Sequence, residues 1–272
     1  MATMTRSSRS RSKPAARGKT AARRKPVERK GKVASKRVAA AKSASNAARK
    51  SVRSSGASAR EKALAEVFGP VLSKLTLHCL DKNCPVLSAA AEDGASILQF
   101  SQRPDRMNWV SVTHGLSQAK SADRAELLLQ WRIRDAKLPV RVLAEAARYL
   151  LQTGTQLAPG AMLSASDDKP VNCGISTLPH WMVCLPDKAM LDQLKSLDSS
   201  LRVLLLVGIT EGELQSALRV RPEIADGRRV LFEALRIGQV YPITDPNRTC
   251  LTRRRDFHRV WESAFQLVRT GK

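Results

Sequence analysis

The cysteines and histidines of this chain are its best candidates for metal ligands, but their spacing fits no common site. Two groups stand out: His78, Cys79 and Cys84 form the first, and His180 and Cys184 form the second. Structural zinc sites use ligand pairs at short fixed spacings, such as two Cys-x-x-Cys units, and neither group contains one. Because unpaired cysteine is among the most often buried residues, we interpret these thiols as core residues and expect no metal or other cofactor.

Acid–base or nucleophilic catalysis would need a pair of carboxylates, or a cysteine close to a histidine. Glu211 and Glu213 are neighbours, but they follow an apolar run and open a predicted helix, where carboxylates stabilise the helix N-terminus. Nothing in the sequence places a cysteine beside His114, His180 or His258. We therefore predict that the protein is not an enzyme.

A glycine-containing segment at residues 147–163, ARYLLQTGTQLAPGAML, is the third place to look for a ligand site. A phosphate-binding loop would continue with Gly-Lys-Ser or Gly-Lys-Thr, which does not occur here, and Pro159 has no amide hydrogen to donate. We interpret Gly154 and Gly160 as turn residues with positive φ, a conformation that residues with a Cβ rarely adopt.

Three charged residues fall in segments that are otherwise predicted to be buried. Arg124 and Glu126 belong to an apolar strand, and Arg148 lies beside a core tyrosine on a helix. Buried charges are costly unless they are paired. Two interpretations stay open: an ion pair inside the domain or along a cleft, or contacts with a protein partner, for which Thr153 and Thr155 are further candidates.

Residues 1–57 predict a disordered basic tail. Residues 1–60 contain 19 lysines and arginines and a single acid, Glu28, so most of the net charge of +23 belongs to them. The first 57 residues include no Leu, Ile, Phe, Trp or Tyr. A segment with so little to bury cannot offset the entropy lost on folding.

A tail of this composition binds polyanions by releasing condensed counterions, without reading base sequence. It has no aromatic residue that could stack on bases. We predict weak, salt-sensitive association with DNA or RNA, and a purely solubilising tail or an organelle transit peptide are the alternatives. The candidate nucleic-acid residues are Arg23, Arg24, Lys25, Arg29 and Lys30.

Residues 58–272 predict one folded domain. Ser58 and Glu61 have the spacing of a helix capping box, and apolar residues then recur at helical intervals as far as Leu75. Short β-like runs separated by polar turns predict neighbouring strands. These runs are Ile97–Ser101, Trp109–Thr113, Ala125–Ile133 and the strongly apolar Arg202–Ile209.

Predicted helices alternate with these strands. Pro139 starts a helix that ends near Gly154, and a second capping box at Thr210–Glu213 leads into a helix at residues 214–218. Helical periodicity also marks residues 228–237 and 257–268, with Arg253–Arg255 as the exposed start of the last helix. We predict an α/β (α+β) domain with a mixed β-sheet flanked by helices.

The cysteine count and the N-terminus bear on the cellular compartment. Five cysteines are an odd number, and no apolar segment follows the basic N-terminus as a secretory signal requires. No run approaches the roughly 18 apolar residues of a membrane-spanning helix. We predict a soluble cytoplasmic protein with reduced thiols and no membrane partner, which is associated with the nucleoid if its tail binds DNA.

Five segments of the predicted domain form a recognisable series. They are WVSVTHGLS (109–117), RAELLLQWR (124–132), ARYLLQTGTQLAPGAML (147–163), VLLLVGITEGEL (203–214) and DPNRTCL (245–251). In order and spacing they resemble the Suppressor of fused domain family, and the resemblance extends over residues 67–251. It implies the fold of that family for most of residues 58–272.

At three positions the chain departs from the pattern of that family. His114 stands where the family usually has tyrosine, Gly208 where it usually has proline, and Ala161 where it often has histidine. These departures indicate a divergent member, in which the partner specificity of better-known relatives does not carry over directly.

The resemblance implies a function in protein recognition. Animal members of the family hold a transcription factor by pairing one of its segments as a β-strand, and bacterial members resemble immunity proteins of toxin systems. The length of the chain favours the bacterial, single-domain type. We therefore expect a non-enzymatic protein-binding domain whose partner is a toxin or a regulatory protein, with a nucleoid-associated protein that acts through its basic tail as the alternative.

Overall fold

The computed structural model describes residues 58–77, 83–105, 107–119, 125–132, 137–164 and 177–271. The predicted tail, with its five candidate nucleic-acid residues, lies outside this part of the chain, as do Arg124, His78, Cys79 and Cys173. Among the helices of the described residues, none combines the length and the apolar surface that crossing a lipid bilayer would require.

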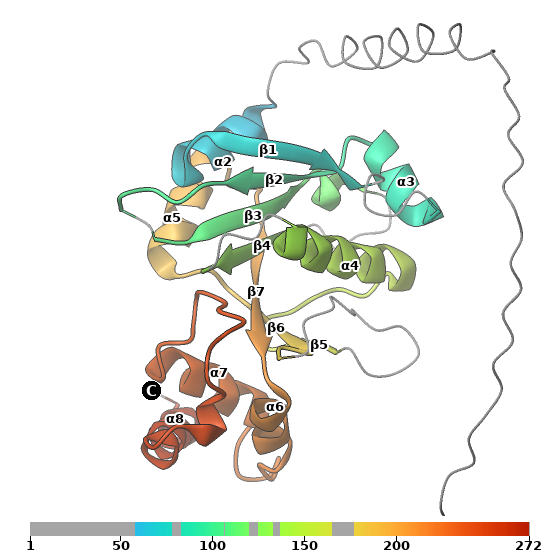
Figure 1. The fold of residues 1–272 in the computed structure, drawn as a ribbon. Coiled ribbons are helices and arrows are strands. Elements are labelled where there is room, and N and C mark those ends of the chain that lie inside the picture. Colours follow the sequence, from blue (N-terminus) through green and yellow to red (C-terminus); the bar gives the residue numbers. More distant parts are fainter. Residues whose placement is uncertain are drawn as a thin grey trace, which may run out of the picture. The chain divides into compact units, whose positions relative to one another are not determined.

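Seven strands form one sheet in the order β1-β2-β3-β4-β7-β6-β5 (Figure 1). All neighbouring pairs are antiparallel except β4 and β7, which are parallel. The sheet confirms the predicted mixed α/β class. The strands are β1 (Val71–Thr76), β2 (Ser96–Phe100), β3 (Trp109–His114), β4 (Glu126–Trp131), β5 (Met162–Ser164), β6 (His180–Cys184) and β7 (Val203–Ile209).

Helices cover both faces of this sheet, and each face has its own apolar cluster. Successive residues of β4 point to opposite faces, so Leu127 and Leu129 join one cluster and Leu128 joins the other. This double burial explains why β7 is a continuous apolar run and why β4 contains three successive leucines rather than an alternating pattern. The helices are α2 (Ala59–Phe68), α3 (Pro85–Glu92), α4 (Lys137–Thr153), α5 (Lys188–Leu197), α6 (Glu211–Leu218), α7 (Gly227–Ile237) and α8 (Phe257–Thr270).

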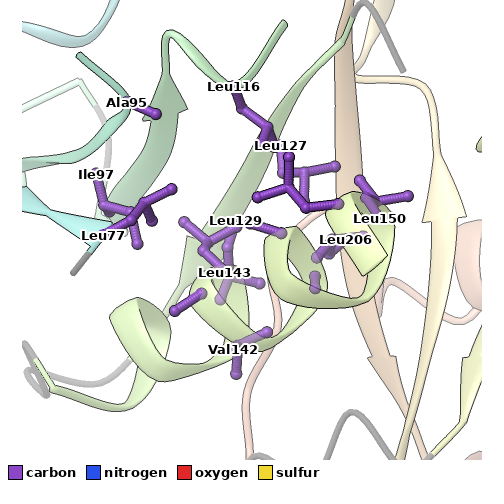
Figure 2. Packing of buried hydrophobic residues seen from close by; sticks show 14 of the residues in the cluster. Leu77, Ala95, Ile97, Leu116, Leu127, Leu129, Val142, Leu143, Leu150 and Leu206 are labelled. Atoms are coloured by element: carbon purple, nitrogen blue, oxygen red, sulfur yellow. The ribbon is translucent and has the colours of Figure 1, made fainter. Parts of the chain in front are cut away.

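Helix α4 packs on the first face. Its residues Val142, Leu143 and Leu150 recur at helical spacing and meet Leu127 and Leu129 of β4, as Figure 2 shows. Helix α3 belongs to the same cluster, whereas α2, α5, α6, α7 and α8 contribute to the cluster on the opposite face.

The first helix is shorter than the sequence predicts. It ends at Phe68, because Gly69 adopts a positive φ of 91° and Pro70 has no amide hydrogen for a further helical turn. The prediction that the helix continues to Leu75 was therefore wrong, and Val71 instead begins strand β1. Helices α3 and α5 were not predicted.

Candidate functional site

Glu126 is the first residue of β4 and is fully buried. Its Oε2 atom accepts a hydrogen bond from the Thr113 hydroxyl at 2.8 Å, and its Oε1 atom accepts one from the Ser117 hydroxyl at 2.7 Å. Two backbone amides, those of Gly115 and Ser117, also donate to Oε1. The Arg60 guanidinium lies 3.6 Å from the same oxygen, so Glu126 takes part in a buried ion pair, one of the two interpretations left open.

Arg60 connects the first helix to three other parts of the domain. Besides facing Glu126, its guanidinium donates to the Asp198 carboxylate at 3.2 Å and to the Ser117 hydroxyl at 2.7 Å. The neighbouring Ser58 caps α2 through the amide of Glu61 and lies 2.7 Å from Nε2 of His114. The start of α2 is therefore fixed to β3, to β4 and to the end of α5.

The end of α4 gathers three of the predicted partner-binding residues. Arg148 forms an ion pair with Glu145 at 2.6 Å, which is only partly buried. The Thr153 hydroxyl donates to the Tyr149 carbonyl and accepts from the Thr155 amide, and both threonines are exposed. Contact of any of these residues, or of Glu126, with a partner stays a prediction.

The two turn glycines behave as the sequence indicates. Gly154 and Gly160 have φ values of 63° and 89°, and nothing lies within 4 Å of the position of an added Cβ at either residue. Backbone conformation, rather than close packing, is therefore the reason for glycine here. The Gly160 amide donates to the Val183 carbonyl at 2.7 Å, which ties the turn to β6.

The predicted capping box at the start of α6 is present, but its glutamate also does something the sequence did not reveal. Glu213 is almost fully buried and accepts two hydrogen bonds from Arg248, at 2.5 and 2.6 Å. Burial opposes ionisation, yet the hydrogen bonds and charge of Arg248, with the amides of Leu251 and Thr210, hold the pKa of Glu213 below its usual value. The only sequence signal for Arg248 is its place in the segment DPNRTCL.

Glu211 is exposed and meets a buried histidine. Its carboxylate lies 2.6 Å from Nε2 of His180, and this hydrogen bond, with a second from Gln215, lowers the pKa of Glu211. Glu211 and Glu213 thus have different partners and do not act as a carboxylate pair.

The thiols that the structure describes are dispersed. Cys84 and Cys184 are buried, and burial raises the pKa of the Cys184 thiol to about 12. Cys250 is partly exposed between the hydroxyls of Thr210 and Thr252. Within the described ranges, no group of three or more His, Cys, Asp or Glu residues is arranged to hold a metal ion.

The prediction of an exposed Arg253–Arg255 run was wrong for its middle residue. Arg254 forms two hydrogen bonds with Asp256, at 3.0 and 2.9 Å, and a third with the Gly238 carbonyl at 2.7 Å. The last helix begins only at Phe257, and Arg254 joins the segment before it to the end of α7. Arg253 and Arg255 are exposed as expected.

Strand β1 is the last strand at one side of the sheet, and no strand of the described residues pairs with its outer edge. Leu72 on this strand is 60% exposed. Lys74 is turned back toward α2, where its ammonium group lies 2.6 Å from Glu61. This edge, with which no described strand pairs, therefore carries one exposed apolar side chain.

A mixed sheet with helices packed on both faces defines an α/β domain. The chain belongs to the Suppressor of fused protein (SUFU) family, whose model matches residues 91–249. This confirms the resemblance seen in the sequence, and the domains of this family are protein-interaction domains. No curated protein matches the chain.

Solved structures of similar fold include a SUFU homologue from Neisseria gonorrhoeae FA 1090, with a TM-score of 0.52 and 16% identity over 71% of this chain and 95% of that one. At this identity the likeness concerns the fold alone. A Sufu–Fu complex (TM-score 0.47, 17% identity, 76% and 94% covered) and Drosophila Suppressor of Fused (0.47, 16%, 77% and 53%) are more distant. The chain spans about half the length of the Drosophila protein.

Proposed function

We propose that this chain is a non-enzymatic protein-binding domain that receives an extended segment of its partner along the outer edge of β1. The observation that carries the proposal is the position of this six-residue strand at the side of the sheet, where no other described strand pairs with its outer edge (Figure 1). Membership of a family of protein-interaction domains supports it.

Strand addition uses main-chain hydrogen bonds for affinity and side-chain contacts for specificity. A β-bulge between Val71 and Ser73 interrupts the pairing with β2, and the register is continuous from Ser73 to Thr76. A partner strand along this stretch would cover Leu72, whose exposed side chain is otherwise unfavourable in water. The ion pair of Lys74 with Glu61 keeps its charge away from the partner.

The predicted partner-binding residues have two different roles in this proposal. Glu126 acts indirectly, because its network with Arg60 holds α2 beside the sheet. Arg148, Thr153 and Thr155 offer polar contacts at the end of α4 for a part of the partner outside the added strand. Arg124 stays a candidate that the structure does not describe.

The partner that we propose is a toxin, in line with the immunity proteins that bacterial members of the family resemble, and a regulatory protein is the alternative. Neutralisation requires that co-expression of this chain restores growth of cells that express the toxin. Candidate toxins are those encoded beside the gene for this chain.

The experiment that tests the binding mode compares two leucines of equal exposure. Leu72 on β1 and Leu218 on α6 are each 60% exposed, so Leu72→Glu and Leu218→Glu change the surface equally. We expect Leu72→Glu to abolish capture of the partner in a pull-down, whereas Leu218→Glu captures it like the unchanged chain. Equal capture by both variants would rule out the β1 edge.

A second function, binding to a polyanion, is supported by the 19 lysines and arginines of residues 1–60. We propose that this segment adds salt-sensitive affinity for nucleic acid or for an acidic partner. Pull-downs at low and high salt separate the two modes, since domain-driven capture survives high salt and tail-driven capture does not.

A further inference from the structure

A cavity of about 370 Å³ lies between the end of β4, the end of α7 and the segment that precedes α8. Three arginines from separate segments line it: Arg132, Arg248 and Arg254. Backbone hydrogen bonds position Arg132. Its amide donates to the Thr244 carbonyl, and the Thr244 amide donates to the Gln130 carbonyl. The loop that carries Asp245 and Arg248 is thereby held against the end of β4.

The guanidinium groups retain hydrogen-bond donors after their internal partners are counted. Each guanidinium has five N–H bonds. Arg248 gives three of them to Glu213 and the Gly208 carbonyl, and its Nε, which is buried, has no partner among the described residues. Arg132 forms an ion pair with Asp245 at 3.7 Å, a distance too long for a hydrogen bond, and its side chain makes no hydrogen bond to the described residues.

Each lining arginine has a carboxylate near it: Glu213 beside Arg248, Asp256 beside Arg254, and Asp245, which also lines the cavity, beside Arg132. The excess positive charge near the cavity comes from the neighbouring segment. Arg253 and Arg255 flank Arg254 in the chain, are exposed and form no ion pair with the described residues. The surroundings of Arg254 are therefore positively charged. The positions of the guanidinium N–H donors in the cavity determine which anion fits.

Gln239 lines the cavity and has a φ of 56°. It is the left-handed residue of the Schellman motif that ends α7, since the Val240 amide donates to the Leu235 carbonyl and the Gln239 amide donates to the Arg236 carbonyl. This helix end fixes the backbone of one cavity wall.

We propose that this cavity binds a single oxyanion group, a carboxylate or a phosphate, which Arg132 engages through two N–H donors on one edge of its guanidinium while Arg254 and Arg248 line the cavity beside it. Planar guanidinium groups bind both kinds of oxyanion through paired hydrogen bonds, and Arg132 is the lining arginine with all its side-chain donors available. The site is separate from strand addition at β1 and does not depend on it.

The test is a titration of the full chain, labelled with ¹⁵N, with inorganic phosphate and separately with citrate, at ionic strength held constant with chloride. Amide shifts of Arg132, Gln239 and Thr249 report the cavity residue by residue, so binding of anions by the basic tail does not interfere. We expect these shifts to saturate, and Arg132→Gln to weaken the affinity about tenfold, the loss expected for one charged hydrogen-bond pair.

The matched control is Arg141→Gln, which removes one exposed arginine of α4 and should leave the titration unchanged. Saturation by phosphate alone identifies a phosphate site, and saturation by citrate alone identifies a carboxylate site. Shifts that stay linear for both anions, or the same affinity in Arg132→Gln and the unchanged chain, would overturn the proposal. Capture of a protein partner at Leu72 should be the same in Arg132→Gln and in the unchanged chain, so failure of this proposal is distinguishable from failure of the β1 proposal.

Discussion

The carboxylate of Glu213 and the guanidinium of Arg248 meet end to end, with both oxygens bonded, where their side chains are 1% and 9% exposed. This pair fixes the loop after α7 to the first turn of α6. Because each ion is withdrawn from water, the pair stabilises the fold only while both partners are present.

Arg248→Met should lower the free energy of unfolding by about 3–5 kcal/mol, because it leaves the Glu213 carboxylate buried without its cation. Urea unfolding followed by circular dichroism measures the loss. Arg236→Met is the control, since Arg236 pairs with Glu233 at 2.7 Å but is 55% exposed, and it should cost less than about 1 kcal/mol. Equal losses in the two variants would contradict a special role for the buried pair.

His114 should make stability depend on pH in the mildly acidic range. Burial lowers the pKa of His114 below 6.5, although Glu126 opposes the shift. The unfolded chain therefore takes up a proton at a higher pH than the folded chain, so this contribution is present above pH 6.5 and is lost as the pH falls through the folded pKa.

We expect the urea midpoint to fall between about pH 7 and pH 5 and this fall to be smaller in His114→Gln. His258→Gln, which changes an exposed histidine of α8, should retain the full pH dependence. A midpoint profile that is identical in all three proteins would refute the assignment.

Gly208→Ala should destabilise the domain by about 1–3 kcal/mol, because an added Cβ would lie 2.8 Å from Cδ1 of Leu178 and 3.1 Å from Cγ2 of Thr244. Calorimetry measures the change. In the double variant with Leu178→Ala the nearest obstacle is gone, so the combined loss should be smaller than the sum of the two single losses. Additive losses would show that the crowding is not the cause.

Replacing Arg23, Arg24, Lys25, Arg29 and Lys30 by Gln should weaken binding to duplex DNA and make it less sensitive to salt. If each cation contacts one phosphate, the slope of log K against log salt becomes shallower by roughly 4.5. Lysine at the three arginine positions keeps the charge and should keep the slope. An unchanged slope in the Gln variant would show that these five residues do not contact DNA.

Local signals in the sequence predicted much of the fold correctly. Strand β7, the capping box at Thr210 and the amphipathic α8 each follow from residues within one element. Strand β1 was missed because Val71, Leu72 and Leu75 also fit helical spacing, and the Gly69-Pro70 break was the stronger signal. Helix α5 has one local signal in the sequence, Asp187, whose side chain caps the helix by accepting a hydrogen bond from the Met190 amide.

The contacts of the candidate site were beyond local signals. The sequence identifies Glu126 as a charge that needs a partner, but the partner is Arg60, from helix α2 at the start of the domain. Glu213 finds Arg248 in the same way. Such pairs depend on which strands and helices become neighbours, and residue spacing within one segment does not contain this information.

The single parallel pairing in the sheet has a consequence for the kinetics of folding. Strands β1 to β4 are a meander of successive antiparallel neighbours, and β5 to β7 are a second one. Among the strands that the structure describes, the pairing from Glu126↔Val203 to Leu128↔Leu205 joins the two meanders, between residues far apart in the chain. Strand pairing within each meander closes a shorter stretch of chain than the pairing of β4 with β7. We therefore expect the pairing of β4 with β7 to limit the folding rate.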